Sequence, residues 1–217
     1  MEHAVAAFTK AGVERMVVVP LLLFAAGHAK RDIPAALRPS LALQASIADP
    51  LGCEPEILEL SHRRFGEATA GRSPIPPEAT CLLLVGRGSS DESATAAMHE
   101  FARRRQAMEG GMPLAVAFLA KARPSLAEQL PQIAGLGYRR IIVQPHLLFV
   151  GELSSSVERQ VATAATEFPH SEWLVAPLLA DPPSVRGIGT ELLARVICER
   201  YRGSLQWPAS STRGSET

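Results

Sequence analysis

Residues 136–152 read LGYRRIIVQPHLLFVGE, an apolar run that ends at Gly151 and is followed by a helical pattern. Residues 11–27 read AGVERMVVVPLLLFAAG and repeat this stretch 125 positions earlier. Four pairs of residues coincide at that spacing: Gly12 and Gly137, Arg15 and Arg140, Pro20 and Pro145, and Phe24 and Phe149. Similarity at a fixed spacing is the signature of a repeated structural unit. We therefore expect the chain to contain two copies of one unit.

The apolar runs indicate strands of a parallel sheet, because they do not alternate with polar residues as strands with one solvated face do. Such runs lie at 15–24, 81–86, 113–120, 140–149 and 172–180. Amphipathic helix candidates lie at 92–108, 126–135, 154–167 and 184–202. Strands that alternate with helices predict an α/β fold with an open parallel sheet.

Three of the expected helix starts carry a Ser-x-x-Glu capping box, in which a serine side chain and a glutamate satisfy free backbone N–H groups. The three matches are Ser89–Glu92, Ser125–Glu128 and Ser155–Glu158. Each falls where a strand is expected to pass into a helix, so the matches support the alternation of strands and helices.

The proline-rich stretch AGRSPIPPEAT, residues 70–80, predicts a linker between two lobes. We expect a partial first lobe over residues 1–69, a second lobe over 81–203 and a disordered, Ser/Thr-rich tail over 204–217. Residues 81–125 read strand–helix–strand and have no counterpart in the first lobe. The expectation is that the first lobe lacks a segment of this length, about 45 residues, at its front.

The composition excludes several classes of function. The 217 residues are 47% hydrophobic and 20% charged, which is typical of a folded chain with a large core. Lys+Arg and Asp+Glu balance at 22 each, so nothing points to a nucleic-acid partner or to a polybasic membrane-binding surface. The widely spaced Cys53, Cys81 and Cys198 fit no metal or disulfide pattern and are interpreted as small core residues of a cytoplasmic protein.

Ligands of open α/β sheets bind at the carboxyl ends of the strands. Three segments meet that rule: Gly27-His28, Gly86–Ser90 and Gly151-Glu152. His28 is the sharpest candidate, since a neutral imidazole there can bind a metal ion or move a proton near pH 7. The alternative is a surface loop histidine, and the residues alone leave both open.

The turn GRGSS, residues 86–90, offers free N–H groups and the charge of Arg87 to an anion, but a plain strand-to-helix turn fits equally well. His146 lies inside an apolar run, which favours a core histidine. No local two-histidine spacing occurs, so a metal site has to be assembled from distant segments.

Four stretches together resemble a known family: VVVPLLLFAAGHAKRDIP (17–34), LLLVGRGSSDESATAAMHEFAR (82–103), VAFLAKARPSLAEQL (116–130) and IIVQPHLLFVGELSSSVERQV (141–161). They are similar to the sirohydrochlorin cobaltochelatase/ferrochelatase family, the CbiX-like class II chelatases, over nearly all of residues 5–203. The resemblance implies two flavodoxin-like lobes around a cleft. It also implies ATP-independent insertion of Co²⁺ or Fe²⁺ into sirohydrochlorin, on the way to cobalamin or sirohaem.

For the site, the resemblance implies that His28 is a catalytic metal ligand, with proton acceptance as a second role. It corresponds to the histidine of the family's GHxxxD-type loop. The family's other histidine, in a GHGSR-type turn, and its acidic residue have no counterparts in the first lobe. In the second lobe their places are taken by Arg87 and by Ala120 or Arg123, and Leu153 stands in the place of His28, so this lobe is interpreted as a non-metallating wall of the cleft.

Sirohydrochlorin carries many carboxylates, so cations are expected around the cleft. The residues expected to contact it are Lys30, Arg31, Arg87, Ser89, His146 and Glu152. Co²⁺ is the first choice of metal substrate, with Fe²⁺ and Ni²⁺ as alternatives that the same ligands suit, and no organic cofactor is expected. A homodimer is one option for the assembly.

Two other functions stay open on the sequence. The chain could be a catalytically incomplete metal- or tetrapyrrole-binding protein, because one ligand suffices for weak binding but not for insertion. It could also be an anion-binding α/β domain in which the GRGSS turn is the main site and His28 is incidental.

Overall fold

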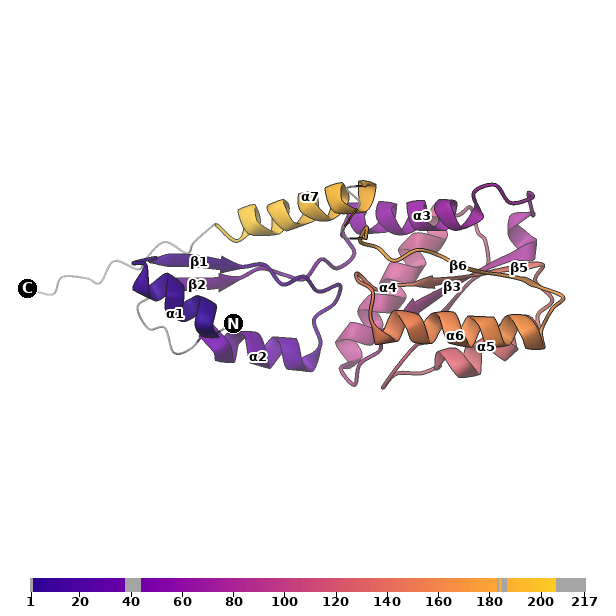
Figure 1. Cartoon of the computed structure of the whole chain (residues 1–217), viewed down its shortest axis with the longest axis horizontal. Helices are drawn as coiled ribbons and strands as arrows, with labels where there is room; N and C mark the ends of the chain where they lie inside the picture. The colour runs from indigo at the N-terminus through magenta and orange to yellow at the C-terminus, as the bar shows by residue number, and fades with distance from the viewer. Residues whose placement is uncertain (1, 38–43, 183, 185–186, 206–217) are drawn as a thin grey trace, which may run out of the picture.

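A computed structural model describes residues 2–37, 44–182, 184 and 187–205, without the side chains of Glu2, His28 and Ala29. Residues 206–217, most of the expected tail, lie outside the described part. The fold is mixed α/β, with parallel sheets flanked by helices as the sequence predicts (Figure 1). None of the described helices combines the length and the apolar character that crossing a membrane requires.

The second lobe contains a four-stranded parallel sheet in the order β4-β3-β5-β6. Its strands are β3 (Thr80–Gly86), β4 (Leu114–Phe118), β5 (Arg140–Pro145) and β6 (Glu172–Val175). The connecting helices are α4 (Glu92–Met108), α5 (Leu126–Ala134) and α6 (Glu152–Glu167), and a short 3₁₀ turn, η1 (Pro77–Ala79), precedes β3. β3 and β5 lie in the centre and every described residue of both is buried, which explains why their sequences are apolar throughout.

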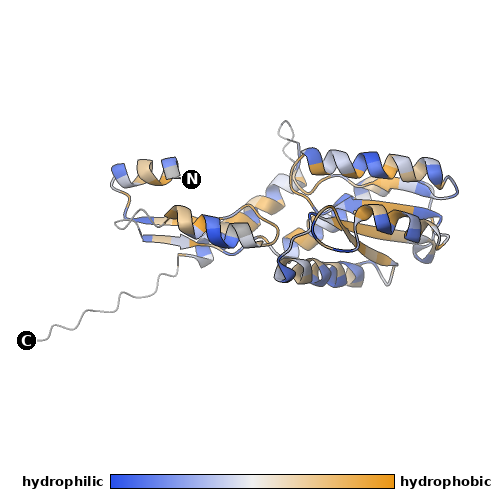
Figure 2. Cartoon of the chain, turned by 90° about the horizontal axis from the view of Figure 1, so that it is seen from below, coloured by the Kyte–Doolittle hydropathy of each residue, from blue (hydrophilic) through white to orange (hydrophobic). Residues whose placement is uncertain are grey.

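Successive residues of the central strands point into two separate cores, because side chains alternate between the faces of a strand. Leu82, Leu84 and Ile142 pack against one face, with side chains of α3, α4 and α7. Leu83 and Val143 pack against the other face, with side chains of α5 and α6. Figure 2 shows largely apolar strands lying between helices in which hydrophilic and hydrophobic residues are mixed.

The first lobe consists of α1 (Glu2–Lys10), β1 (Arg15–Val18), α2 (Gly27–Leu37), β2 (Gln44–Ile47) and α3 (Pro55–Thr69), and β1 pairs with β2 in parallel. The repeat is confirmed in register: β1 and β5 begin 125 positions apart, at Arg15 and Arg140, and α2 and α6 likewise begin at Gly27 and Glu152. β1 has one described neighbour, β2, where β5 has two, β3 and β6.

Helices α3 and α7 (Ile188–Gly203) join the two lobes. α3 belongs to the first lobe by sequence, yet it packs on the sheet of the second, where Ile57 and Leu60 are fully buried in the shared core. α7 lies along α3 and extends toward the β1–β2 pair (Figure 1), where the Ser46 hydroxyl donates to the Ser204 carbonyl at 3.3 Å. α3 thus completes the core of the second lobe, and α7 extends from that core to the first lobe.

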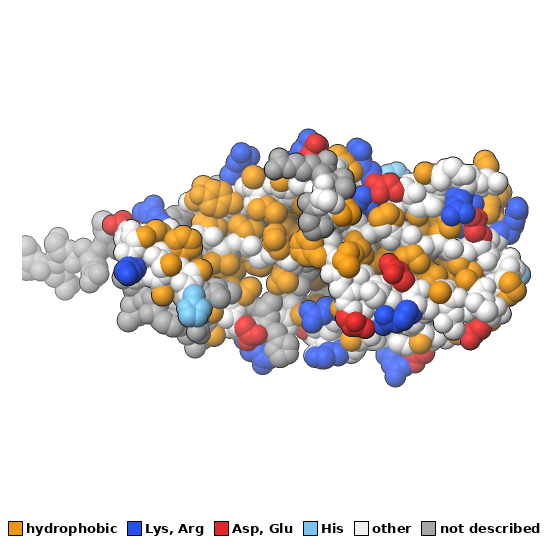
Figure 3. All heavy atoms as spheres, in the orientation of Figure 1, with side chains coloured by type: hydrophobic (Ala, Val, Ile, Leu, Met, Phe, Trp, Pro, Cys, Tyr) orange, Lys and Arg blue, Asp and Glu red, His pale blue; other side chains and the backbone are white. Residues whose placement is uncertain are grey.

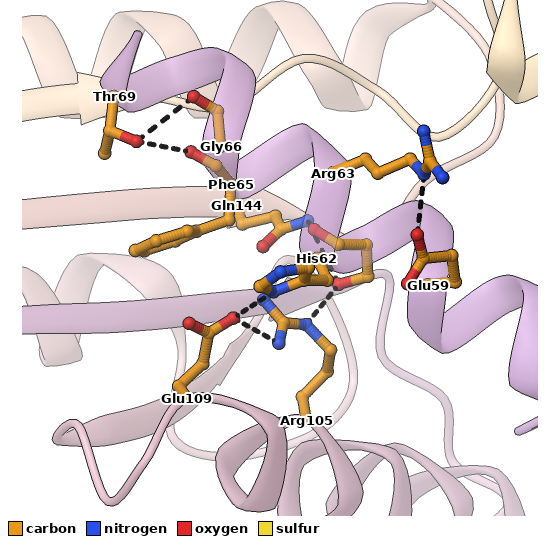
Figure 4. A network of polar contacts seen from close by, with 10 residues as sticks. Glu59, His62, Arg63, Phe65, Gly66, Thr69, Arg105, Glu109 and Gln144 are labelled. Carbon is orange, nitrogen blue, oxygen red and sulfur yellow. Dashed lines mark hydrogen bonds and ion pairs between the residues drawn. The ribbon is translucent and has the colours of Figure 1, made fainter.

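A buried polar network fixes α3 on the second lobe (Figure 4). Arg105 of α4 is fully buried and donates from Nε to the Ser61 hydroxyl at 3.0 Å. Its guanidinium pairs with Glu109 at 2.5 Å, and Glu109 also contacts His62 of α3 at 2.8 Å. Gln144 of β5 donates to the Ser61 carbonyl at 2.7 Å. The network joins α3, α4 and β5 at one point.

Several expected boundaries were wrong. The strand expected over 140–149 ends at Pro145, and the helix expected over 184–202 begins at Ile188. α2 begins at Gly27, includes His28 and continues through Pro34. Of the three capping boxes, only Ser125–Glu128 is confirmed. Asp91 caps α4, and α6 begins at Glu152, where the Ser154 hydroxyl bonds to Gly151.

The cysteines are free thiols. Cys81 is buried, and desolvation raises the pKa of its thiol to about 12, in agreement with a core role. Cys53 is half-buried. Cys198 is exposed on α7, so its assignment to the core was wrong.

Candidate functional site

The segments that follow the carboxyl ends of β1, β3, β4 and β5 surround a pocket of about 600 Å³. Its walls come from residues within 21–26, 86–89, 118–121 and 146–154, and from one side of α4. Most of these side chains are apolar, among them Leu22, Phe24, Met98, Phe118 and Leu148. The pocket lies where an open α/β sheet is expected to bind its ligand, and both lobes contribute to it.

Gly88 allows the segments after β3 and β4 to meet. Its φ of +81° is a conformation that favours glycine, and a Cβ atom on it would lie 1.8 Å from the carbonyl oxygen of Ala120. Backbone bonds then join the two segments: Leu119 N–H donates to Gly86 at 3.1 Å and Ala120 N–H donates to Arg87 at 3.0 Å. This contact holds Arg87 beside the end of the β4 segment.

Three of the described charged side chains line the pocket: Arg87, Lys121 and Glu152. The Glu152 carboxylate is 86% exposed and accepts a bond from Arg159 at 3.0 Å. Arg87 and Lys121 are exposed and have no ion pair or hydrogen bond with another described side chain. Ser89 also lines the pocket, and its hydroxyl accepts from the Asp91 N–H at 3.0 Å. Of the residues expected at the cleft, Arg87, Ser89, Glu152 and His146 are brought together here.

His146 lies at the apolar wall and is 3% exposed. Its ring stacks on Phe24 at 5.3 Å between centroids and contacts Phe101 at 4.2 Å. Neither ring nitrogen has a hydrogen-bond partner within the described part of the chain. Burial lowers the pKa of His146 to about 3, so the imidazole is neutral at physiological pH. The expected core histidine is therefore also a pocket residue.

The structure describes the backbone of His28 in the first turn of α2, while its side chain lies outside the described part. Two observations bear on its surroundings. Ala26, two residues earlier, lines the pocket, and so does Leu153, the residue that matches His28 at the repeat spacing of 125. Since α2 and α6 begin in the same register, the position of His28 is the counterpart of a pocket position.

Lys30 and Arg31, also expected to contact the substrate, are exposed and are not among the described residues that line this pocket. The Lys30 ammonium bridges the lobes instead, pairing with Asp91 at 2.9 Å and donating to Ser93 at 2.7 Å. Bonds from Ser93 and Lys30 lower the pKa of Asp91 to about 2. Lys30 therefore already has an anionic partner at the start of α4.

One group of three described acidic or metal-ligating side chains has the spacing of a metal site, and it lies away from the pocket. Glu54, Glu56 and Glu199 have oxygens within 4.8 Å of one another, and Glu54 pairs with Arg200 at 2.5 Å. None of these residues lines the pocket. The described side chains of the pocket thus supply cations and apolar surface rather than a cluster of metal ligands.

Sequence reasoning missed Lys121 and most of the apolar wall. Lys121 lies in the segment that follows the end of β4 at Phe118, so the rule that ligands bind at the carboxyl ends of strands pointed to its position. Nothing in the sequence pattern distinguishes it from the neighbouring Arg123, which instead pairs with Glu128.

A family model described as CbiX matches residues 1–68 and 81–196. Among curated relatives, a sirohydrochlorin ferrochelatase of Priestia megaterium is 29% identical over 171 residues, which are 77% of this chain and 63% of the relative. A sirohydrochlorin cobaltochelatase of the same organism is 25% identical over 181 residues, 82% of this chain and 59% of the relative. The chain thus spans about three fifths of the length of these relatives.

The structure of SirB from Bacillus subtilis with Fe³⁺ superposes with a TM-score of 0.73 at 25% identity, covering 95% of this chain and 79% of the other. A structure of SirB from Bacillus subtilis subspecies spizizenii in complex with cobalt gives a TM-score of 0.68 at 25% identity, covering 94% of this chain and 77% of the other.

Proposed function

Because this chain belongs to the CbiX family, we propose that it functions in the insertion of a divalent metal ion into sirohydrochlorin. Co²⁺ is the proposed metal substrate. Fe²⁺ is one alternative, since curated relatives are named for both iron and cobalt. Ni²⁺ is another, because the same ligands suit it. No ATP or organic cofactor is required by the proposal.

The observation that carries the proposal is the inter-lobe pocket. Its wall is apolar, which suits the face of a conjugated macrocycle, and its two unpaired cations, among the described side chains, suit the carboxylates at the rim of such a ring. The pocket is built from loops of both lobes, so a ring bound there lies beside the β1–α2 segment that leads to His28.

In the proposed reaction the ring loses two N–H protons as the divalent ion enters, and the product is the metallated ring. Neutral imidazole suits Co²⁺, Fe²⁺ and Ni²⁺ as a ligand and can also accept a proton. His28 is proposed to hold the ion and to receive one of these protons. Arg87, Ser89, Glu152 and His146 are proposed to contact the ring or its substituents, whereas Lys30 and Arg31 would have to act from outside the described pocket.

The test is a chelation assay that follows the absorbance of sirohydrochlorin with Co²⁺. We expect His28→Ala to abolish insertion, while the far-ultraviolet circular dichroism of the variant stays unchanged because the position lies in the first turn of α2, where alanine is compatible with a helix. His3→Ala, which alters an exposed histidine of α1, is the matched control and should retain the wild-type rate. An undiminished rate for His28→Ala would refute the assignment.

A second candidate is a metal- or tetrapyrrole-binding protein that does not catalyse insertion. It is favoured by the described pocket side chains, which include no cluster of metal ligands, and by Arg87 and Leu153 at the second-lobe positions that match the family's histidines. The same assay separates the two: binding of sirohydrochlorin without turnover supports the carrier.

The division into lobes over 1–69 and 81–203, the homodimer and the cytoplasmic location stay predictions. The family model leaves residues 69–80 unmatched between its two segments, which is compatible with a linker there.

A further inference from the structure

The pocket carries a pair of cations for which the described structure offers no anionic partner. Arg87 follows β3 and Lys121 follows β4, two neighbouring strands of the sheet. Both side chains line the pocket and both are exposed. The third charged residue of the wall, Glu152, comes from another segment and is bonded to Arg159. The described charges in the pocket therefore sum to one net positive charge, and both cations are available to a ligand.

The backbone that presents Lys121 is specialised. Lys121 has a φ of +58°, and among the described residues it is the one non-glycine residue with a positive φ. For an L-amino acid with a side chain this conformation costs about 1 kcal/mol. The chain keeps it in the segment that the Ala120–Arg87 and Leu119–Gly86 backbone bonds hold against the turn at Gly88. The same contact thus positions both cations at one side of the pocket.

We propose that Arg87 and Lys121 act together as the binding site for one carboxylate of the substrate, and so determine the preference for a carboxylated macrocycle. This inference rests on the proposed function, because the carboxylate belongs to the sirohydrochlorin ring. Arg87 offers a planar fork of donors and Lys121 a single flexible donor, a combination that can satisfy both oxygens of a carboxylate. The apolar wall holds the ring face, and the pair fixes its orientation.

The first experiment measures binding of metal-free sirohydrochlorin by absorbance titration. Lys121→Ala and Arg87→Ala should each weaken binding about tenfold, as expected for loss of a charge-assisted hydrogen bond. The double variant should be weaker than either, but by less than the product of the two factors, because both cations serve one carboxylate. Arg123→Ala is the matched control: this cation lies two residues along the same segment but pairs with Glu128 and should change binding less than twofold.

Two further variants separate recognition from structure. Lys121→Gly suits the positive φ better and should be at least as stable as the wild type, yet should bind as weakly as Lys121→Ala. Lys121→Arg keeps the charge and should restore most of the affinity. In the chelation assay, Lys121→Ala should raise KM with little change in kcat, since a carboxylate remote from the ring nitrogens is bound equally in ground and transition states.

A fully esterified sirohydrochlorin serves as the second ligand, since it lacks the charges that the pair would bind. Its affinity should be the same for the wild type and Lys121→Ala. If the wild type binds sirohydrochlorin and Lys121→Ala binds it equally well, the cation pair is overturned while the proposed function stands. If the two single effects multiply in the double variant, one shared carboxylate is overturned. If the wild type binds no sirohydrochlorin, the proposed function itself fails.

Discussion

His146 is a buried imidazole that the fold keeps neutral at an energetic cost. Neither of its ring nitrogens has a partner in the described structure, and an unsatisfied buried polar group costs about 1–3 kcal/mol. The repeat shows that the position does not require histidine, since its counterpart 125 residues earlier is Leu21. The sequence predicted the burial correctly, because the flanking residues are apolar. It could not predict that the same ring lines the pocket, because the pocket wall also contains Phe24, which belongs to the other lobe and contacts the ring.

We expect His146→Leu to raise the free energy of unfolding at pH 7 by about 1 kcal/mol, because the unsatisfied nitrogens disappear while the volume is roughly kept. Loss of the ring contacts with Phe24 and Phe101 offsets part of the gain. Urea unfolding followed by circular dichroism measures the change. A clear loss of stability would show that a partner satisfies the imidazole in solution.

The pH dependence of stability gives an independent check on the same residue. The folded-state pKa of about 3 lies below the ordinary value of 6.5, so the unfolded chain binds a proton more readily than the folded one. The contribution of the neutral imidazole to the free energy of unfolding should therefore be fully present above pH 6.5. It should be lost as the pH falls toward 3, with a limiting slope of roughly 1.4 kcal/mol per pH unit. His146→Leu should show a flatter profile between pH 6.5 and 5 in the same urea series.

The start of α7 depends on Asp181, which lies in the segment between β6 and this helix. Its carboxylate accepts bonds from the Gly187 and Thr190 N–H groups at 3.1 and 2.6 Å, as a capping residue does. The other oxygen pairs with Arg64 of α3 at 2.7 Å, and both side chains are less than a tenth exposed. One carboxylate thus fixes both the start of α7 and its attachment to α3.

We expect Asp181→Ala to lower the free energy of unfolding by about 3–5 kcal/mol, because it leaves the Arg64 guanidinium buried with less of its charge compensated and removes the cap. Adding Arg64→Met should recover part of the loss, since the unpaired charge is then gone as well. Glu191→Ala, at an exposed acid in the first turn of α7, is the control and should cost less than about 1 kcal/mol. Thermal unfolding of the four proteins measures these differences. No recovery in the double variant would contradict a charge-based account.

Helices and strands with a local sequence pattern were predicted well, whereas those that depend on contacts with distant segments were not. β3, β5, α4 and α5 were predicted to within a residue or a few because their apolar pattern is local and, for α5, because the Ser125 capping box forms. β2 was missed: its four residues, QASI, have little apolar character, and the strand exists because β1 pairs with it. The start of α2 has no such local signal, because its first turn holds no acidic residue and Pro34 lies inside the helix.

For the molecule as a whole, the repeat spacing of 125 predicted which segments are equivalent, and the structure confirms it at β1/β5 and α2/α6. The packing of α3 on the sheet of the second lobe could not be predicted from its sequence, because an amphipathic helix does not specify which sheet its apolar face covers. In Figure 3, hydrophobic side chains gather over the β1–β2 pair and the segments that follow the two strands. This sheet has two described strands, whereas the sheet of the second lobe has four.

The shared core predicts that the two lobes do not open independently. Leu60 of α3 is fully buried in the core formed with β3, α4 and α7, so Leu60→Ala should lower the free energy of unfolding by about 2–5 kcal/mol. Because Leu51 and Phe24, which follow β2 and β1, pack in the same core, hydrogen exchange should accelerate both in β1–β2 and in β5–β6. Leu130→Ala is the matched control: its side chain packs with α6 on the opposite face of the sheet, so exchange should accelerate first in α5 and α6. A Leu60→Ala effect confined to peptides of the second lobe, measured by mass spectrometry, would contradict a core shared between the lobes.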